Sequence, residues 1–486
     1  MRLLPLPSLL LAASLGAPAL PAQSAADSSS PDARAARIAA DLRPAVRVRG
    51  RPIVRSTIEA RMREVGVPAV SVAVVDGGRI AWARAYGVAD VAAGRAATPT
   101  TRFQAASISK PVASTAALQL VAEGKLALDD DVNARLRSWQ VPASPAAGGR
   151  PVTLRQLLSH TAGLTVHGFP GYASGTAVPT VAQILNGEAP ANTRPVRVDT
   201  APGGIWRYSG GGMTVMQLLL SDVTGKPFDT LMQERVLGPA GMTHSTYAQP
   251  LPTALADEAA TGYRRGGAPI AGRYHTYPEQ AAAGLWTTPT DLARWVIAIQ
   301  NAHAGAPGAI LPRATAEAML TAGKGNWGLG PALEGEGDAR RFSHGGSNEG
   351  FRAMTFGYLT GGRGLAVMTN SDLGATVASE LIAAVAREYG WPGYAQREIV
   401  PVPVAPAILD SLAGRYADPA GRAFVASRDG EDLRVVAPGG QRYQLIPTGR
   451  DAFAFAHDGG PMRIERDAAG AVAALVVDRQ RYPRQP

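Results

Sequence analysis

Cysteine is absent from the 486-residue sequence. Its absence excludes disulfides, thiol nucleophiles and cysteine-based metal sites. The sequence also lacks three motifs that mark other enzyme classes: the G-x-S-x-G nucleophile elbow, the H-E-x-x-H zinc motif and the Walker phosphate loop. The seven histidines include no pair spaced four residues apart, the spacing of two ligands on one helix face. We therefore predict a protein with no metal site and no cofactor.

Lysine is scarce in a chain that is otherwise rich in basic residues. Only four of the 48 basic residues are lysines (Lys110, Lys125, Lys226 and Lys324), so the other 44 are arginines. The net charge of +9 raises the question of an anionic partner, but the arginines are scattered and form no run interleaved with aromatic residues. We therefore predict no nucleic-acid binding. The hydrophobic share of 46% is typical of a chain that buries a core.

The N-terminus has the pattern of an export signal. Arg2 is followed by an apolar stretch, Leu3 to Leu15, of 13 residues, which is too short to span a bilayer. Ala17-Pro18-Ala19 is a small-residue cleavage site, and Ala22 offers a second one. We predict a signal peptide at 1–22, a leader segment at 23–48 and an exported protein, periplasmic or secreted. No later run is long enough for a membrane helix, so no membrane span is expected.

Hairpins near both ends of the next region enclose a mostly helical middle. Strand patterns at 69–75 and 79–86 are joined by the turn Asp76-Gly77-Gly78, and strand patterns return at 351–358 and 364–369. Periodicity and capping signals predict helices around 58–65, 104–123, 154–158, 214–224 and 289–299, and another that ends near 389. These elements predict an α+β domain at 49–396, with an antiparallel sheet flanked by helices and a helical insert.

The composition changes around residue 400. Pro401, Pro403 and Pro406 indicate a linker, which we place at 397–410. Beyond it, short segments with alternating apolar residues are separated by turns such as Asp429-Gly430. This pattern predicts a small C-terminal β-domain at 411–486 that resembles a β-barrel.

One lysine stands three residues after a serine, in Ser107-Ile108-Ser109-Lys110. Residues at i and i+3 share one face of a helix. Pro111 lacks an N–H and fits only the first turn of a helix, so Ser107 should lie near a helix N-terminus. There the lysine amine can take the hydroxyl proton and the helix end favours developing negative charge. On its own the motif is equally compatible with an ordinary helix start and a solvated lysine.

Two further motifs follow in order, Tyr208-Ser209-Gly210 and His344-Gly345-Gly346-Ser347. With Ser107 and Lys110, the sequence resembles the serine hydrolases of the class C β-lactamase and D-Ala-D-Ala carboxypeptidase superfamily. Their signatures are Ser-x-x-Lys, Tyr-x-Asn or a variant, and Lys/His-x-Gly, in this order and at similar spacing. Flanking segments also look alike, among them 152–164, 237–247 and 283–292, and the resemblance covers about 53–389.

The resemblance implies a mechanism through an acyl-enzyme on Ser107. Lys110 and Tyr208 would form the proton-transfer pair, with either as the immediate base. The backbone N–H groups of Ser107 and Ser347 would form the oxyanion hole, and His344 would hydrogen-bond Tyr208 or the substrate. Gly345, Gly346, Gly210 and Trp206 are the candidate substrate-binding residues.

Two departures from the family pattern bear on the substrate. Gly210 stands where an asparagine is usual, and His344 replaces the lysine of the β-lactamases, which removes a fixed positive charge. Both favour an esterase or a D-amino-acid peptidase or amidase over a β-lactamase. A small ester, a D-aminoacyl peptide and a β-lactam all remain possible substrates, and the oligomeric state stays open. The alternative is a penicillin-recognising sensor or a non-catalytic binding protein of the same fold.

For other polar and aromatic residues, the sequence predicts less specific roles. His160 is expected to cap a helix end and pack, and Asp129-Asp130-Asp131 is expected to form a solvated loop. Trp206, Glu279 and Trp286 are expected to wall the substrate cleft.

Overall fold

The computed structural model describes residues 29–394, 396–438, 440–457, 459–477 and 480–486. The signal peptide predicted at 1–22 lies outside these residues, so its cleavage site and the predicted export stay predictions. Within the described ranges, no helix has the length and apolar character needed to cross a bilayer.

A seven-stranded antiparallel sheet forms the centre of the first domain, in the order β4-β3-β2-β10-β9-β8-β7. Strands β2 and β10 pair along their length although they lie about 290 residues apart, so the two ends of the domain meet in the middle of the sheet. Both strands are buried almost throughout, which fits their largely apolar sequences. The bounds are β2 (Ala69–Asp76), β3 (Arg79–Asp90), β4 (Arg95–Ala96), β7 (Ala332–Glu334), β8 (Arg341–Asn348), β9 (Phe351–Tyr358) and β10 (Gly364–Thr369).

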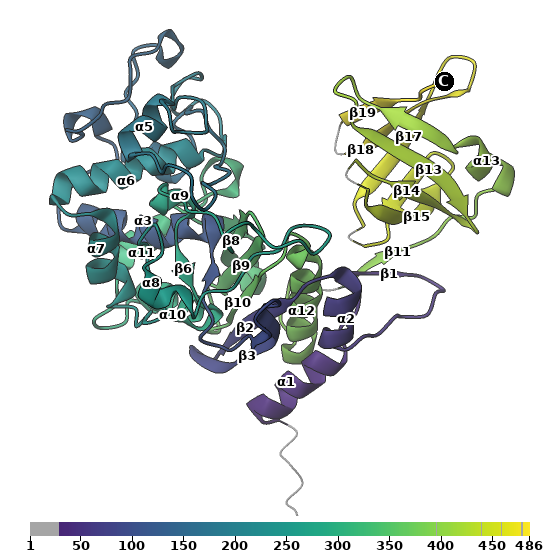
Figure 1. The fold of residues 1–486 in the computed structure, drawn as a ribbon, viewed down its shortest axis with the longest axis horizontal. Coiled ribbons are helices and arrows are strands. Elements are labelled where there is room, and N and C mark those ends of the chain that lie inside the picture. The colour runs from purple at the N-terminus through teal and green to yellow at the C-terminus, as the bar shows by residue number, and fades with distance from the viewer. Residues whose placement is uncertain (1–28, 395, 439, 458, 478–479) are drawn as a thin grey trace, which may run out of the picture.

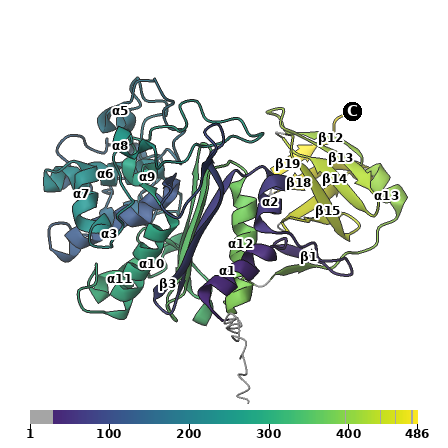
Figure 2. The ribbon, with the colours of Figure 1, turned by 60° about the horizontal axis from the view of Figure 1, so that its bottom comes forward.

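Helices cover both faces of this sheet (Figure 2). On one face lie α1 (Pro31–Ala40), α2 (Ile58–Val65) and α12 (Gly374–Tyr389), whose apolar residues share a core with β2, β9 and β10. On the other face lies α10 (Pro289–Ala304), with the rest of the helical insert beyond it (Figures 1 and 2). The predicted α+β architecture, including both hairpins, is confirmed.

The helical insert forms a second core that packs against the sheet. Its helices are α3 (Ser109–Ala122), α4 (Leu154–Leu158), α5 (Val181–Asn186), α6 (Gly210–Thr224), α7 (Phe228–Met232), α8 (Thr253–Ala256), α9 (Gln280–Ala283) and α11 (Arg313–Met319), with a two-stranded ribbon of β5 (Phe103–Gln104) and β6 (Trp286–Thr287). Helices α4 and α10 begin where the capping signals predicted, at Thr153 and Thr288. Helix α6 begins at Gly210, four residues before the expected start, because the Ser209 side chain caps it.

The segment expected as a leader, 23–48, contains regular structure in its described part. Ser30 caps α1, Pro31 occupies its first turn, and Ala35 and Ile38 are buried in the core that includes α12. A one-sided apolar helix gains stability by covering a sheet layer, which is what α1 does here. Residues 31–40 therefore form a helix that packs on the first domain, within the segment expected as a leader.

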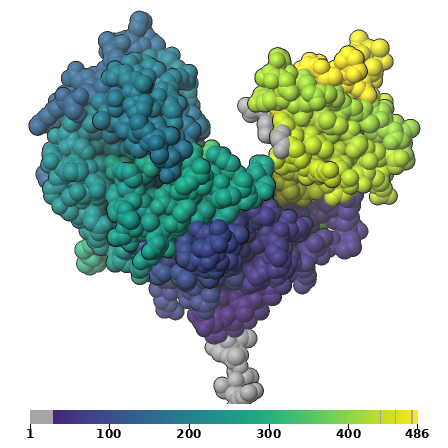
Figure 3. Space-filling model, viewed as in Figure 1, coloured from purple at the N-terminus to yellow at the C-terminus, as the bar shows by residue number. Residues whose placement is uncertain are grey.

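The C-terminal domain is an eight-stranded antiparallel sheet that is almost closed into a barrel. A bridge between Tyr416 and Arg484 joins its first strand to the residue that follows its last strand. The predicted barrel-like domain is confirmed, and Figure 3 shows it as a separate mass beside the helical insert. The strands are β12 (Gly414–Ala417), β13 (Ala423–Asp429), β14 (Asp432–Val436), β15 (Arg442–Gly449), β16 (Ala452–Phe455), β17 (Pro461–Arg466), β18 (Val472–Val477) and β19 (Gln480–Pro483).

The predicted linker, 397–410, is partly ordered into short elements. Strand β11 (Arg397–Ile399) pairs in parallel with β1 (Val46–Val48), and α13 (Pro406–Ser411) opens the barrel domain. The pairing of β1 with β11 therefore joins the segment that precedes the first domain's sheet to the segment that follows it, just before the barrel begins.

Candidate active site

Ser107 lies in a tight turn at the start of α3. The turn is a short 3-10 helix, η1 (Ala106–Ile108), and regular α-helix begins at Ser109, five residues later than the expected 104. Ala106 has a φ of 50°, a value that costs a residue with a side chain. Gly346 of β8 packs directly on this turn, because a Cβ there would lie 2.2 Å from the Ala105 carbonyl oxygen. The turn and the strand therefore fix each other, and a glycine is required at their contact.

Lys110 lies beside Ser107 in a fully buried position. Its Nζ donates to Ser107 Oγ at 3.0 Å and to the Ala282 carbonyl oxygen at 2.7 Å. The side chain is among the most buried of the described residues, and this burial lowers the pKa of Lys110 to about 7. A substantial share of the amine is therefore neutral near pH 7 and able to accept a proton from the serine.

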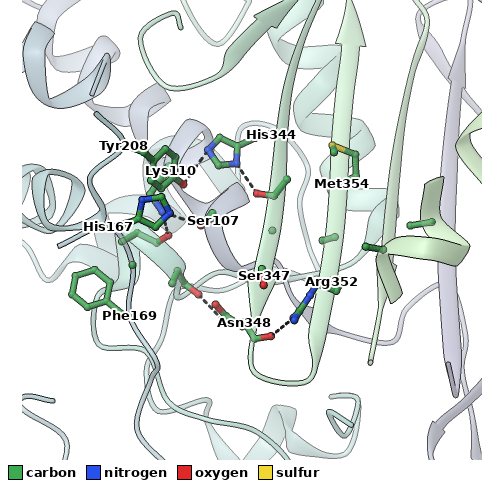
Figure 4. A pocket seen from close by; sticks show the side chains of 18 of the residues that line it. Ser107, Lys110, His167, Phe169, Tyr208, His344, Ser347, Asn348, Arg352 and Met354 are labelled. Carbon is green, nitrogen blue, oxygen red and sulfur yellow. Dashed lines mark hydrogen bonds between the residues drawn. The ribbon is translucent and has the colours of Figure 1, made fainter. Parts of the chain in front are cut away.

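Tyr208 and His344 complete the group around Ser107 (Figure 4). The Tyr208 hydroxyl lies 3.5 Å from His344 Nε2, and His344 Nδ1 donates to the Gly345 carbonyl oxygen at 2.7 Å. Since Nδ1 carries the proton, Nε2 is the acceptor for the tyrosine. Burial, reinforced by the charge of Lys110, lowers the pKa of His344 to about 3, so the ring is neutral.

Burial acts on Tyr208 in the opposite direction. It raises the pKa of Tyr208 above its ordinary value, and the hydrogen bond to Ser107 offsets only part of this. The Lys110 Nζ lies 4.9 Å from the centre of the Tyr208 ring. Tyr208 is therefore a protonated phenol at neutral pH, next to an amine that titrates near neutrality.

His160 holds the segment that carries Tyr208. Its carbonyl oxygen accepts from Arg207 N at 2.8 Å, and its Nδ1 accepts from Ser209 N at 3.3 Å. Its ring lies 4.3 Å from the Tyr208 ring, centre to centre. His160 thus fixes the backbone on both sides of the tyrosine, which goes beyond the packing role expected from sequence.

Three residues that the motifs did not indicate complete the surroundings of Tyr208. The His167 ring lies 4.9 Å from the Tyr208 ring, and the Trp327 ring lies 5.7 Å from Tyr208 and 5.4 Å from His344. Phe169 lies beside His167 in the same loop, and both line the cavity. No sequence motif marks the loops that carry these residues. The seven-residue spacing between His160 and His167 is the one signal in the sequence, and such a spacing is not specific to an active site.

Gly210 stands where the resemblance noted above would place an asparagine, and a side chain there would be crowded. A Cβ at Gly210 would lie 3.0 Å from the His167 carbonyl oxygen and 3.0 Å from Phe169 Cε2. Gly210 N also donates to the His167 carbonyl oxygen at 3.0 Å. The loop that contains His167 and Phe169 therefore packs closely against Gly210.

These groups open into a cavity of about 770 Å³. The volume is within the range of small-molecule sites. Ser347, more than a third exposed, and Gly345 line it along the edge of β8, where β7 no longer pairs with the strand. The lining residues are Ser107, Lys110, His167, Gly168, Phe169, Tyr208, Ala282, Ala283, His344, Gly345, Gly346, Ser347, Asn348, Arg352, Ala353, Met354, Ala375, Ala378, Ser379 and Ile382.

Four residues expected at the cleft are not part of this lining. Gly210 is buried beneath the loop described above, and Trp206 packs on Trp327, with 36% of its surface exposed. Trp286 is fully buried against Phe351. Glu279 is fully buried beside Tyr172, and burial raises its pKa to about 8. The expectation that Trp206, Glu279 and Trp286 wall the cleft is therefore wrong for the cavity seen here.

The sheet and the helical insert form a penicillin-binding-protein-like fold. A crystal structure of SurE superimposes with a TM-score of 0.56 at 24% identity, over 88% of this chain and 97% of that one. The penicillin-binding protein homologue from Pyrococcus abyssi gives 0.58 at 21% identity, over 87% and 98%.

The family model named Beta-lactamase matches residues 54–388, and the chain belongs to this family. Among curated relatives, the D-aminopeptidase of Brucella abortus is 28% identical over 309 residues, which cover 62% of this chain and 56% of the relative. Protein flp of Staphylococcus aureus is 28% identical over 251 residues, which cover 49% and 47%. The chain thus spans about half the length of the curated relatives it matches.

Proposed function

We propose that the protein is a serine hydrolase that cleaves an ester or an amide through an acyl-enzyme on Ser107. The observation that carries this proposal is the 3.0 Å contact between the buried Lys110 Nζ and Ser107 Oγ at the end of a 770 Å³ cavity. A nucleophile and a base within hydrogen-bond reach, with a substrate-sized space beside them, are the parts that nucleophilic catalysis needs. The D-aminopeptidase relative supports the same class of reaction.

Acylation begins when neutral Lys110 takes the Ser107 proton and Oγ bonds to the substrate carbonyl carbon. The carbonyl oxygen becomes an oxyanion, which we assign to the N–H groups of Ser107 and Ser347. In comparable enzymes one such donor is worth about 3–4 kcal/mol. The pKa directions favour Lys110 as the base over Tyr208, because the phenol stays protonated near neutral pH.

The leaving group departs when the tetrahedral intermediate collapses. Tyr208 can donate its proton to the leaving oxygen or nitrogen and recover it from protonated Lys110. Water then attacks the acyl carbon and gives a proton to the same pair. The bond between the acyl carbon and Ser107 Oγ breaks, and the pair returns the proton to Oγ, which releases the acid and free Ser107. His344 accepts from the Tyr208 hydroxyl and holds it between the lysine and the substrate.

Substrate class is part of the proposal. Neutral His344 provides no fixed cation for the carboxylate of a β-lactam, and Gly210 provides no side-chain amide to contact a β-lactam. These two features support an ester or a D-aminoacyl amide or peptide over a β-lactam. The N-terminal signal pattern further supports export, with the reaction taking place in the periplasm or outside the cell.

A fluorophosphonate probe tests the proposal. It should label the wild-type protein at Ser107, as located by peptide mass spectrometry, and Ser107→Ala should lose both labelling and hydrolysis of p-nitrophenyl esters. Ser159→Ala, at a half-buried position outside the cavity, is the matched control and should keep both. Full ester hydrolysis by Ser107→Ala would end the proposal, and labelling by penicillin without turnover over hours would favour the sensor alternative.

A further inference from the structure

The cavity continues from Ser107 past the edge of β8 to helix α12. Gly345 lies at this edge, where a Cβ would be in ordinary contact, 3.7 Å from Met354 Cε. The absence of a side chain at Gly345 leaves the passage open between the catalytic groups and the outer face of β9. We name this part of the cavity the α12 arm; its lining residues are Gly345, Met354, Ala375, Ala378, Ser379 and Ile382.

The α12 arm is lined by small and apolar side chains. Ala375, Ala378, Ser379 and Ile382 follow one another at helical spacing and so form a single stripe along α12. Ala378 and Ile382 are buried, whereas Ala375 and Ser379 are exposed at the mouth. Met354 of β9, labelled in Figure 4, lines the same cavity and packs against the core that contains Ala378 and Ile382. A substrate group here would bury apolar surface against the helix.

The charged residues of the lining are already engaged. Arg352 Nη2 lies 3.0 Å from Asp372 Oδ1, and its Nη1 donates to the Asn348 and Phe351 carbonyl oxygens at 2.7 Å each. Lys110 is held by Ser107 and Ala282. No aspartate or glutamate is among the described residues that line the cavity. A carboxylate or an ammonium of a substrate would therefore meet no unpaired opposite charge there.

We propose that the α12 arm binds an uncharged apolar group of the ester or amide substrate and discriminates against substrates that place a charge in it. The inference rests on the proposed function and narrows its substrate class. Moving a charge from water into a site without a partner costs free energy, whereas an apolar group gains it. A peptide is thus a poor substrate when its carboxylate or its free amino terminus would have to enter the arm.

Two matched pairs of p-nitrophenyl-type esters test this inference. The butyrate and hemisuccinate esters of p-nitrophenol differ by a carboxylate on the acyl side, and p-nitrophenyl and 3-carboxy-4-nitrophenyl acetates differ by one on the leaving group. In at least one pair the wild-type kcat/KM should favour the neutral member by roughly tenfold or more. A ratio within about twofold in both pairs would overturn the inference.

A charge placed at Ser379 should change this preference. Its side chain donates only to the Thr376 carbonyl oxygen at the exposed surface, so replacement leaves the core intact. Ser379→Arg should raise kcat/KM for the disfavoured carboxylate ester relative to its neutral partner by roughly fivefold or more, and Ser379→Glu should lower it further. Ala383→Arg adds the same charge to the same helix outside the cavity and should leave the ratio unchanged. An unchanged ratio in Ser379→Arg would contradict the inference.

The experiment separates this inference from the proposed function. If no ester is hydrolysed and Ser107 is not labelled, the proposed function fails. Calorimetric binding of the same ester pairs to Ser107→Ala then decides the inference alone: tighter binding of the neutral member supports it, and equal binding overturns it.

Discussion

Replacing Lys110 by methionine should stabilise the protein near neutral pH while it removes the catalytic base. Methionine has a similar length and no charge, so it fills the buried position without the amine. A fall in the pKa of Lys110 from 10.5 to about 7 corresponds to about 5 kcal/mol against the charged amine. At pH 7 this amounts to a penalty of about 4 kcal/mol on the folded state. Methionine leaves the Ala282 carbonyl without its donor, at a cost of about 1–3 kcal/mol, so a net gain of about 1–3 kcal/mol remains.

The stability difference between Lys110→Met and the wild type should depend on pH, and the direction of the pKa shift of Lys110 sets the sign of that dependence. The pKa of Lys110 in the folded state lies below its value in the unfolded state, so the unfolded chain binds more protons between about pH 7 and 10.5. The penalty is therefore present in full below pH 7 and disappears as the pH rises through 10.5. The advantage of Lys110→Met should be largest below pH 7 and should reverse by about pH 10.5, where only the lost hydrogen bonds remain.

Denaturant unfolding of the wild type and Lys110→Met at several pH values measures this difference. Lys125→Met, which changes a lysine with a half-exposed side chain, is the control and should alter the free energy of unfolding by no more than about 0.5 kcal/mol at each pH. A Lys110→Met variant that is less stable than the wild type at pH 7, or a difference that does not change with pH, would refute the reasoning. The same variant should lose about 10²–10⁴-fold in kcat.

Three further outcomes follow from the site. The kcat/KM for a neutral ester should fall as the pH decreases through about 7, because protonated Lys110 cannot accept the Ser107 proton, and a flat profile from pH 5 to 9 would contradict this. Gly346→Ala should lower kcat by about 100-fold or more, since its Cβ would displace β8 from the Ser107 turn; a loss no greater than that of Gly345→Ala would argue otherwise. His160→Phe keeps an aromatic side chain but removes the nitrogen that accepts from Ser209 N, so kcat should drop by about tenfold with little change in KM. A change confined to KM would exclude a role of His160 in positioning Tyr208.

Much of the fold was predictable because its signals are local. The turn at Asp76-Gly77-Gly78 predicts the hairpin of β2 and β3, and Thr153 and Thr288 mark the starts of α4 and α10. Helix α1 was missed because its apolar residues, Ala35 and Ile38, are few and gain their stability from packing on α12.

The three motifs indicated side chains that the structure brings together around one cavity, namely Ser107, Lys110, Tyr208 and His344. His167, Phe169 and Trp327 could not be predicted from sequence. Their loops reach Tyr208 only through the tertiary folding of the insert, and no local sequence pattern marks them. Glu279 and Trp286 were misplaced for the same reason: both flank α9, which lines the site through Ala282 and Ala283 while they are buried behind it.

The central claim is that Ser107 carries the acyl group during turnover. Rapid mixing of the wild-type protein with p-nitrophenyl butyrate, acid quenching and peptide mass spectrometry tests it directly. We predict a butyryl group on Ser107 that forms within the first turnover and is absent from Ser107→Ala. Hydrolysis that proceeds with Ser107 unmodified, or with the acyl group on another residue, would contradict the account.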